Sequence, residues 1–102
     1  MARMIAMYRK PADEAAFDAY YFGTHVPIAK KIPGLRSYEV NHGGVATPAG
    51  LSDFHLIAIL TFDSIADIQA GLGSTEGQAA AADLGNFAQA GVDLLFFDTK
   101  EV

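Results

Sequence analysis

The sequence predicts an α+β fold, in which a four-stranded antiparallel sheet carries helices on one face. Two observations lead to this prediction. Segments with the two-residue period of strands alternate with segments of helical period, in the order β-α-β-β-α-β. The length of 102 residues and the 51% hydrophobic content suit one compact core, so we expect a single domain over residues 1–102. This order of elements is the ferredoxin-like, or split β-α-β, arrangement.

The first strand and helix are predicted from apolar pattern and capping residues. Residues 3–9 are short and apolar, as expected of a strand. Either Asp13 is the N-cap, or Pro11 opens the first turn, of a helix whose apolar residues recur every three or four positions to about Thr24. Because Pro27 disfavours helical geometry at the preceding residue, we expect the helix to fray or bend at His25 and a short turn to follow.

The middle of the chain contains the strongest strand signal. Residues 35–43 alternate in the manner of a second strand, although neither face is purely apolar. Residues 43–51, rich in glycine, are predicted to be a flexible connection. Residues 53–62, with the sequence DFHLIAILTF, are apolar on both faces, with Phe54 and Leu56 expected on the same side.

Two short helices and a last strand complete the predicted sheet. Ser64 or the preceding aspartate caps a helix that ends near Gly73, and a second helix runs from position 74 or 75 to about Ala88. Residues 92–98, with the sequence VDLLFFD, form the final strand. The acids of the second helix, Glu76 and Asp83, are expected to be solvated.

The apolar residues on both faces of the last two strands predict a homodimer. The helical segments can cover only one face of a four-stranded sheet, which leaves the other face apolar and bare. A second copy of the chain, packed sheet against sheet, is the simplest cover. We therefore expect a homodimer with an enclosed space between or beside the sheets, in which a small organic ligand would bind.

Composition excludes several classes of partner. The net charge of −5 argues against nucleic-acid binding, which depends on clustered cations. No apolar stretch approaches the ~20 residues that span a bilayer, so no membrane association is expected. No secretory leader is recognisable and cysteine is absent, so we expect a cytoplasmic protein without disulfides or thiolate chemistry.

The chemistry of the chain is concentrated in residues 20–40. His25 suits a general acid or base, since imidazole exchanges protons near neutral pH; the alternative is a histidine that caps helix C-terminal carbonyls. Tyr38 can donate a hydrogen bond to a carbonyl or carboxylate; the alternative is a tyrosine packed at a sheet edge or dimer interface. These two residues are the candidate catalytic groups.

Five further residues are candidates for ligand binding. Tyr20 and Tyr21 point about 100° apart on a helix, so one is expected in the core and the other at the cavity. Arg36 and His42 share the predicted face of Tyr38; Arg36 could grip a carboxylate or remain a solvated or interfacial cation. His55 lies on the third strand, with its side chain opposite to its neighbours.

A metal site is not expected. The three histidines are separated by 17 and 13 residues, which matches no ligand motif, and neither HxH nor HExxH occurs. No dinucleotide fingerprint, phosphate-binding loop or nucleophile elbow is present either. The sequence therefore predicts no metal and no organic cofactor.

The motifs of the first half resemble those of the EthD family, named after ethyl tert-butyl ether degradation. They are F-x-x-Y-Y over residues 17–21, H-x-P-x-A over residues 25–29, and PGL-x-x-Y-E-V over residues 33–40. The resemblance implies a dimeric α+β barrel that acts on small oxygenated molecules, commonly without metal or organic cofactor. In the methylmuconolactone isomerase branch, a helix-end histidine and a strand tyrosine line the pocket, which implies that role for His25 and Tyr38.

Three functions follow from these predictions. The first is a protein of small-molecule catabolism that binds an oxygenated intermediate in a hydrophobic pocket, with acid-base chemistry of the isomerase or cyclase type. The second is a non-catalytic accessory or carrier protein that delivers a hydrophobic compound to a partner oxygenase. The third is a structural dimer without a cavity. The sequence leaves open whether the protein is an enzyme.

Overall fold

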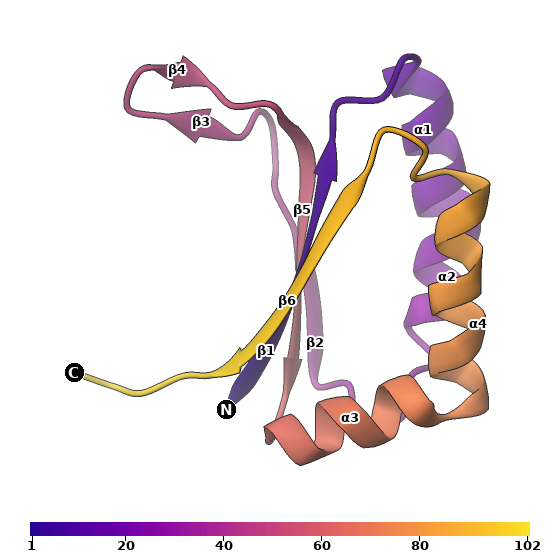
Figure 1. Ribbon diagram of the computed structural model, residues 1–102, viewed down its shortest axis with the longest axis vertical. Helices are drawn as coiled ribbons and strands as arrows, with labels where there is room; N and C mark the ends of the chain where they lie inside the picture. The colour runs from indigo at the N-terminus through magenta and orange to yellow at the C-terminus, as the bar shows by residue number, and fades with distance from the viewer.

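The computed structural model describes residues 1–102 and contains a four-stranded antiparallel sheet with the strand order β2-β5-β1-β6. The strands are β1 (Ala2–Arg9), β2 (Ser37–Val40), β5 (Phe54–Phe62) and β6 (Val92–Asp98). Helices α1 (Glu14–Tyr20), α2 (Val26–Ala29) and α4 (Thr75–Asp83) stand on one side of the sheet, and α3 (Ile65–Gly73) runs across its lower end (Figure 1). The α+β, ferredoxin-like prediction is confirmed.

The first helical region is longer than the sequence predicts. Asp13 caps α1 (Glu14–Tyr20) as expected, accepting a hydrogen bond from the Ala16 amide at 3.0 Å. The chain does not leave helical geometry at His25 but continues through the π-helical segment η1 (Tyr21–His25) into α2 (Val26–Ala29). The Val26 amide bonds the carbonyl five residues earlier, and Pro27 falls in the first turn of α2. The wider π-helical turn just before Pro27 shifts the hydrogen-bond register there, which lets the helix continue past a residue that has no N–H donor.

A β-bulge changes the expected alternation of β5. Tyr8 pairs with Leu56 and Arg9 pairs with Phe54, so His55 is left without a partner in the ladder. Phe54 and Leu56 consequently face opposite sides, which corrects the prediction from strict alternation. The ring of Phe54 lies under the guanidinium of Arg9, 5.3 Å from its centroid to Cζ, while Leu56 is buried in the core.

The segment predicted as a flexible connection contains a short hairpin. Its strands are β3 (Ala46–Thr47) and β4 (Gly50–Leu51), joined through a turn that contains Pro48. Proline and glycine at this spacing are typical of a tight turn, a signal that the prediction did not use. The hairpin projects from the sheet on the side away from α1, α2 and α4 (Figure 1).

The second helical region is split as expected, but its last helix is shorter. It consists of α3 (Ile65–Gly73), α4 (Thr75–Asp83) and the 3₁₀ turn η2 (Leu84–Asn86). Ser74 ends α3 and caps α4, where its hydroxyl accepts a hydrogen bond from the Gly77 amide at 3.0 Å. The chain therefore turns sharply between the two helices, and they contact each other closely at Gly77.

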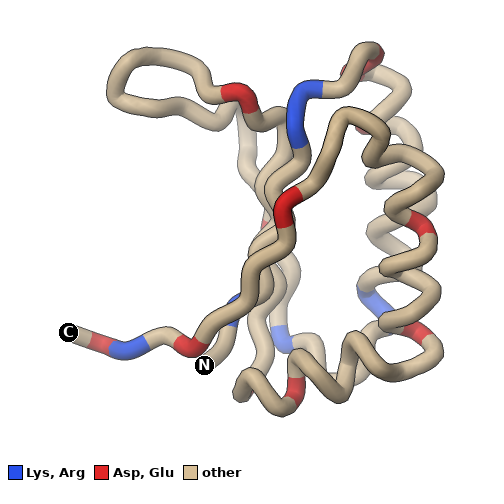
Figure 2. The backbone as a smooth tube through the Cα atoms, in the orientation of Figure 1, with Lys and Arg blue, Asp and Glu red and all other residues tan.

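The face of the sheet opposite the helices is bare and mostly apolar. Its apolar side chains alternate with the buried core: Ile5, Met7, Ile57, Ile59, Leu95 and Phe97. Arg3, Glu39 and Asp93 lie on the same face. Leu95 and Phe97 are 53% and 44% exposed, which is high for large hydrophobic residues. Most charged residues lie on the helices or near the strand ends (Figure 2).

Candidate functional site

A cavity of about 110 Å³ lies between the sheet and the helices of one chain. It is beside the sheet, within one copy of the chain. Of its 17 lining residues, 15 are hydrophobic, so the interior is mainly apolar. Leu94 and Phe96 of β6 line it while remaining 50% and 45% exposed, which marks the open side of the cavity. The polar groups are supplied by His25 and the tyrosines of the wall.

His25 lies at the end of η1 and is buried, with 5% of its surface exposed. Its Nδ1 atom is 2.9 Å from Oδ2 of Asp83, and its Nε2 atom has no hydrogen-bond partner in the protein. The ring packs against Phe87, with a centroid distance of 4.7 Å. Because the carboxylate accepts a hydrogen bond from Nδ1–H, the lone pair of Nε2 is left for a ligand in the cavity.

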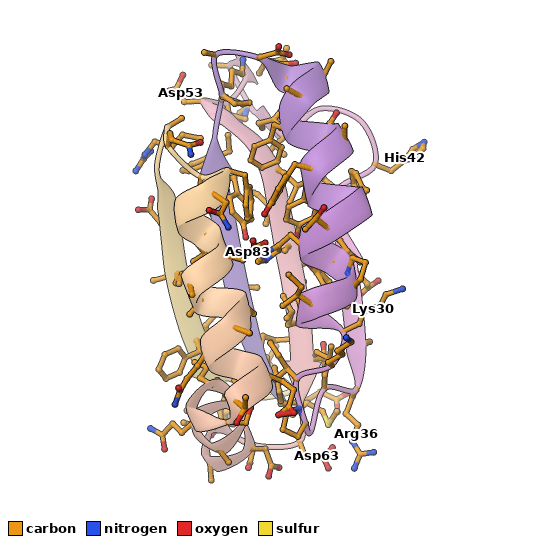
Figure 3. The ribbon with its side chains drawn as sticks, turned by 90° about the vertical axis from the view of Figure 1, so that its right-hand side faces the viewer. Lys30, Arg36, His42, Asp53, Asp63 and Asp83 are labelled. Carbon is orange, nitrogen blue, oxygen red and sulfur yellow. The ribbon has the colours of Figure 1, made fainter.

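Asp83 is the main residue that the sequence prediction missed. It was expected to be solvated, but it is 7% exposed at the end of α4 and points inward between the helices (Figure 3). Its Oδ1 accepts hydrogen bonds from Tyr20 at 2.6 Å and Asn86 at 2.9 Å, and its Oδ2 faces His25. Burial raises the pKa of Asp83, but these three hydrogen bonds outweigh burial and bring the pKa below its usual value.

The spacing of α4 contained the signal for this burial. Asp83 lies three residues after Ala80 and six residues after Gly77, which are both buried in α4. Residues at this spacing share a helix face, so Asp83 belongs to the apolar side of the helix. A buried carboxylate needs partners, and Tyr20, Asn86 and His25 provide them.

Two tyrosines form a second polar group at the cavity. The hydroxyl groups of Tyr21 and Tyr38 are 2.5 Å apart, and both residues line the cavity. Burial is the first cause that raises the pKa of each above its ordinary value, so both remain neutral phenols. One hydroxyl hydrogen is used in their mutual bond, which leaves the other free to bond a ligand oxygen.

The prediction that one of Tyr20 and Tyr21 lies in the core and the other at the cavity is wrong. Tyr21 is fully buried and also lines the cavity, so it is at once the core residue and the cavity residue. Tyr20 does not line the cavity; it supports Asp83 through its hydroxyl. Tyr8 adds a third phenol to the cavity wall, which the sequence prediction did not single out.

The remaining predicted ligand-binding residues lie elsewhere. Arg36 forms two hydrogen bonds to Asp63 at the surface, at 2.7 and 3.1 Å, and points away from the helices (Figure 3). His42 is exposed after β2 and points outward (Figure 3). His55 lies at the bulge, with Nε2 at 2.7 Å from Asp18 of α1. None of the three lines the cavity, and the structure does not bring them together with His25.

No group of three or more histidine, cysteine, aspartate or glutamate side chains is arranged to hold a metal ion. His25 and His55 contact acids on different helices, Asp83 of α4 and Asp18 of α1, and His42 is exposed after β2. None of the helices combines the length and hydrophobicity required to cross a membrane.

Fold and site together define a ferredoxin-like α+β protein with a buried histidine and paired phenols facing an apolar cavity. Residues 9–91 match the EthD domain, so the chain belongs to the EthD family. It is 37% identical to an uncharacterized 11.0 kDa protein from the thcB-thcC intergenic region of Rhodococcus erythropolis, over 100% of this chain and 98% of that protein.

Solved structures agree with this assignment. The crystal structure of an ethyl tert-butyl ether degradation (EthD) family protein from Bacillus halodurans has a TM-score of 0.89 and 36% identity, over 98% of this chain and 99% of that one. SnoaB, a cofactor-independent oxygenase from Streptomyces nogalater, has a TM-score of 0.69 and 11% identity, over 99% and 94% of the two chains. The latter similarity reflects the fold alone.

Proposed function

We propose that this protein binds a small oxygenated organic compound in the cavity and catalyses proton transfer on it, within small-molecule catabolism. The observation that carries this proposal is that His25 and Tyr38 line the same cavity, although they are 13 residues apart and come from a helix and a strand. A nitrogen base and a phenol donor beside one apolar space are the groups that enolisation and isomerisation require.

His25 acts as the base in this proposal. Its Nδ1 proton is held by the Asp83 carboxylate, so Nε2 accepts a proton from a carbon atom next to the substrate carbonyl. The resulting imidazolium is stabilised by the negative charge of Asp83, whose lowered pKa keeps it ionised. His25 then returns the proton to another carbon of the same molecule, and the net reaction is an isomerisation.

The tyrosine pair stabilises the intermediate. As the proton leaves carbon, negative charge develops on the substrate oxygen, and the free hydroxyl hydrogen of Tyr21 or Tyr38 bonds to that oxygen. The two phenols are fixed by their mutual hydrogen bond and by burial, so little rearrangement is needed as the charge develops. The proposed step uses only side chains of this chain.

The EthD family assignment supports a place in catabolism, since the Bacillus halodurans relative carries the name of ethyl tert-butyl ether degradation. Carriage of a hydrophobic compound for a partner oxygenase is the second candidate function. The mainly apolar lining of the cavity favours it, because 15 of 17 lining residues are hydrophobic.

We also propose that the protein is a homodimer joined through the bare face of the sheet. Ile5, Ile59 and Phe97 lie on that face with no helix above them. Removal of such a patch from water is the main driving force for association, and two identical faces can pack symmetrically. The cavity lies on the other side of the sheet, so each copy would keep its own site.

Exchange of carbon-bound hydrogen for solvent deuterium tests the catalytic proposal. The probes are 3-methyl-2-butanone and acetophenone in deuterated buffer, followed by proton NMR. The unmodified protein is expected to accelerate exchange next to the carbonyl. His25→Ala is expected to reduce the accelerated rate by about 100-fold, the lower range of general acid-base contributions. Tyr38→Phe is expected to reduce it by about tenfold, because Tyr21 keeps one hydroxyl at the site.

His42→Ala is the matched control, since this histidine is exposed and outside the cavity. It is expected to leave exchange unchanged. An unchanged rate in both His25→Ala and Tyr38→Phe would overturn the catalytic proposal. Saturable binding of either ketone without any accelerated exchange would favour carriage instead.

A further inference from the structure

We infer that the cavity selects uncharged compounds, with a compact apolar body and one carbonyl or hydroxyl oxygen, and rejects carboxylates. The inference rests on the proposed function, because it names the substrate class of the same cavity. It makes a distinction that the sequence prediction left open, since Arg36 had been considered as a carboxylate ligand.

No lysine or arginine lines the cavity. Arg36 is paired with Asp63 at the surface, and Arg9 is paired with Asp93 at 2.7 Å on the bare side of the sheet. Lys30 is exposed and points outward (Figure 3). A carboxylate that entered the cavity would lose its water without gaining a cationic partner, which is strongly unfavourable.

The single ionisable pair at the cavity already balances its own charge. His25 faces Asp83, so a protonated His25 is neutralised by a carboxylate at 2.9 Å. The carboxylate also holds hydrogen bonds from Tyr20 and Asn86. An anionic ligand would therefore meet a site whose fixed charge is negative or zero, and like charges repel most strongly where water is excluded.

The tyrosines indicate which oxygen the cavity accepts. The hydroxyl groups of Tyr21 and Tyr38 supply a neutral hydrogen-bond donor, which suits a carbonyl or alcohol oxygen. Burial is the first cause of the raised pKa values of Tyr8, Tyr21 and Tyr38. The same exclusion of water that disfavours a phenolate in these positions disfavours a negative charge on a ligand.

The volume limits the apolar body. An engineered protein cavity of about 150 Å³ holds benzene, so the 110 Å³ interior encloses a body slightly smaller than a six-membered ring. Longer compounds can extend through the open side between Leu94 and Phe96, which are half-exposed. The preferred ligand is therefore a small branched or cyclic compound, whose oxygen lies inward at His25 and the phenols.

Two matched pairs of probes test charge selection. In each pair a ketone methyl group is replaced by a carboxylate oxygen: 3-methyl-2-butanone with isobutyrate, and acetophenone with benzoate. Binding at pH 7 is measured by titration of the Met4 methyl signal in NMR spectra, because Met4 lines the cavity. For at least one pair, the ketone is expected to bind and the carboxylate to bind at least 100-fold more weakly.

A cation introduced at the open side should weaken the selection against carboxylates. Leu94→Lys places an ammonium group at the half-exposed edge of the cavity, where its stem can lie along the apolar wall. Leu94→Gln is the matched control, with a polar but uncharged side chain. Carboxylate binding is expected to be at least tenfold tighter to Leu94→Lys than to Leu94→Gln, with both variants folded by circular dichroism.

The outcomes separate this inference from the proposed function. Carboxylates that bind the unmodified protein as tightly as their ketones, or equal carboxylate binding by the two Leu94 variants, would overturn charge selection. Ketone-selective binding without deuterium exchange supports charge selection while contradicting catalysis. Absence of binding by every probe would contradict both. The two proposals can therefore fail independently.

Discussion

Replacement of Asp83 by asparagine is the sharpest test of the buried network. The carboxylate accepts three hydrogen bonds, from Tyr20, Asn86 and His25. Asparagine has nearly the same shape but no charge, and one of its two polar atoms donates instead of accepting. In either orientation the NH₂ group of the new asparagine therefore faces another hydrogen-bond donor. That donor is Nδ1–H of His25 in one orientation and the side-chain NH₂ of Asn86 in the other.

The expected cost follows from these three bonds. Hydrogen bonds to a charged group contribute about 1.5–3 kcal/mol each and neutral ones about 0.5–1.5 kcal/mol, so the three bonds together lose about 3 kcal/mol. Relief of the cost of burying a charge offsets much of this loss, but the donor left unpaired in either amide orientation costs about 1–3 kcal/mol. The free energy of unfolding of Asp83→Asn should therefore fall by about 2 kcal/mol, and Tm by about 10 °C for a domain of this size.

The measurements are urea unfolding, for the free energy, and thermal unfolding, for Tm, both followed by far-ultraviolet circular dichroism at equal protomer concentration for each variant. Asp63→Asn is the matched control, because it makes the same substitution at a half-exposed surface pair, and it should leave Tm nearly unchanged. Nitrogen NMR of His25 supplies a second readout: the Nδ1-protonated tautomer is expected in the unmodified protein and should be lost or mixed in Asp83→Asn.

The pH dependence has a definite sign. The pKa of Asp83 is lowered by folding, so its stabilising contribution is complete above the ordinary carboxyl pKa of about 3.9 and is lost as pH falls through the folded pKa. The stability difference from Asp83→Asn should thus be largest from pH 5 to 7 and shrink in more acidic solution. Equal stability of the two proteins at pH 7, or a difference that grows with acid, would refute the reasoning.

Three more predictions concern packing, ionisation and assembly. Gly77→Ala should lower the free energy of unfolding by about 3 kcal/mol, because the added Cβ would lie 2.7 Å from Cα of Leu72. Gly73→Ala is the control and should leave the free energy of unfolding nearly unchanged, because the space around its Cβ is open. Urea unfolding measures both. Folding raises the pKa of all four tyrosines, so ultraviolet titration of the folded protein should show little tyrosinate at pH 10. The free energy of unfolding should fall as pH rises above 10, because the unfolded chain releases these protons more readily. Ionisation of the tyrosines near pH 10 in a protein that stays folded would contradict their burial. Phe97→Asp should dissociate the proposed homodimer in sedimentation velocity experiments, whereas Phe22→Asp, at a similarly exposed residue of the helical layer, should not; a stable monomer of the unmodified protein at micromolar concentration would exclude the dimer.

The fold was predictable because local pattern and overall topology agree. Strand β5 is apolar at nearly every residue and β6 is apolar at five of its seven, so both were recognised with almost the observed bounds. The hairpin β3–β4 was missed because each strand has two residues, too few for any period to appear. The bulge at His55 was missed because an extra residue leaves no mark in an apolar run.

The site was predictable only in part. His25 and Tyr38 were identified by residue type and by resemblance, and both line the cavity. Asp83 was not, because its importance comes from partners that are 63 and 58 residues away in sequence. Arg36 was wrongly predicted to bind the ligand. Its position on the predicted strand placed it on the same face as Tyr38, but its hydrogen bonds to Asp63 hold the guanidinium at the surface. In both cases the side chain's partner is distant in the sequence, so its position depends on a contact that forms only in the folded chain.

The alternation of β1 separates two evolutionary demands on the same eight residues. Met4 and Tyr8 face the cavity, while Ile5 and Met7 face the bare side of the sheet. The residues that contact a ligand and those that would contact a second copy consequently alternate along one strand. A lineage can alter what it binds at the even-numbered positions without changing the surface that meets a partner, and a mutant library restricted to these positions would explore specificity while the quaternary state stays constant.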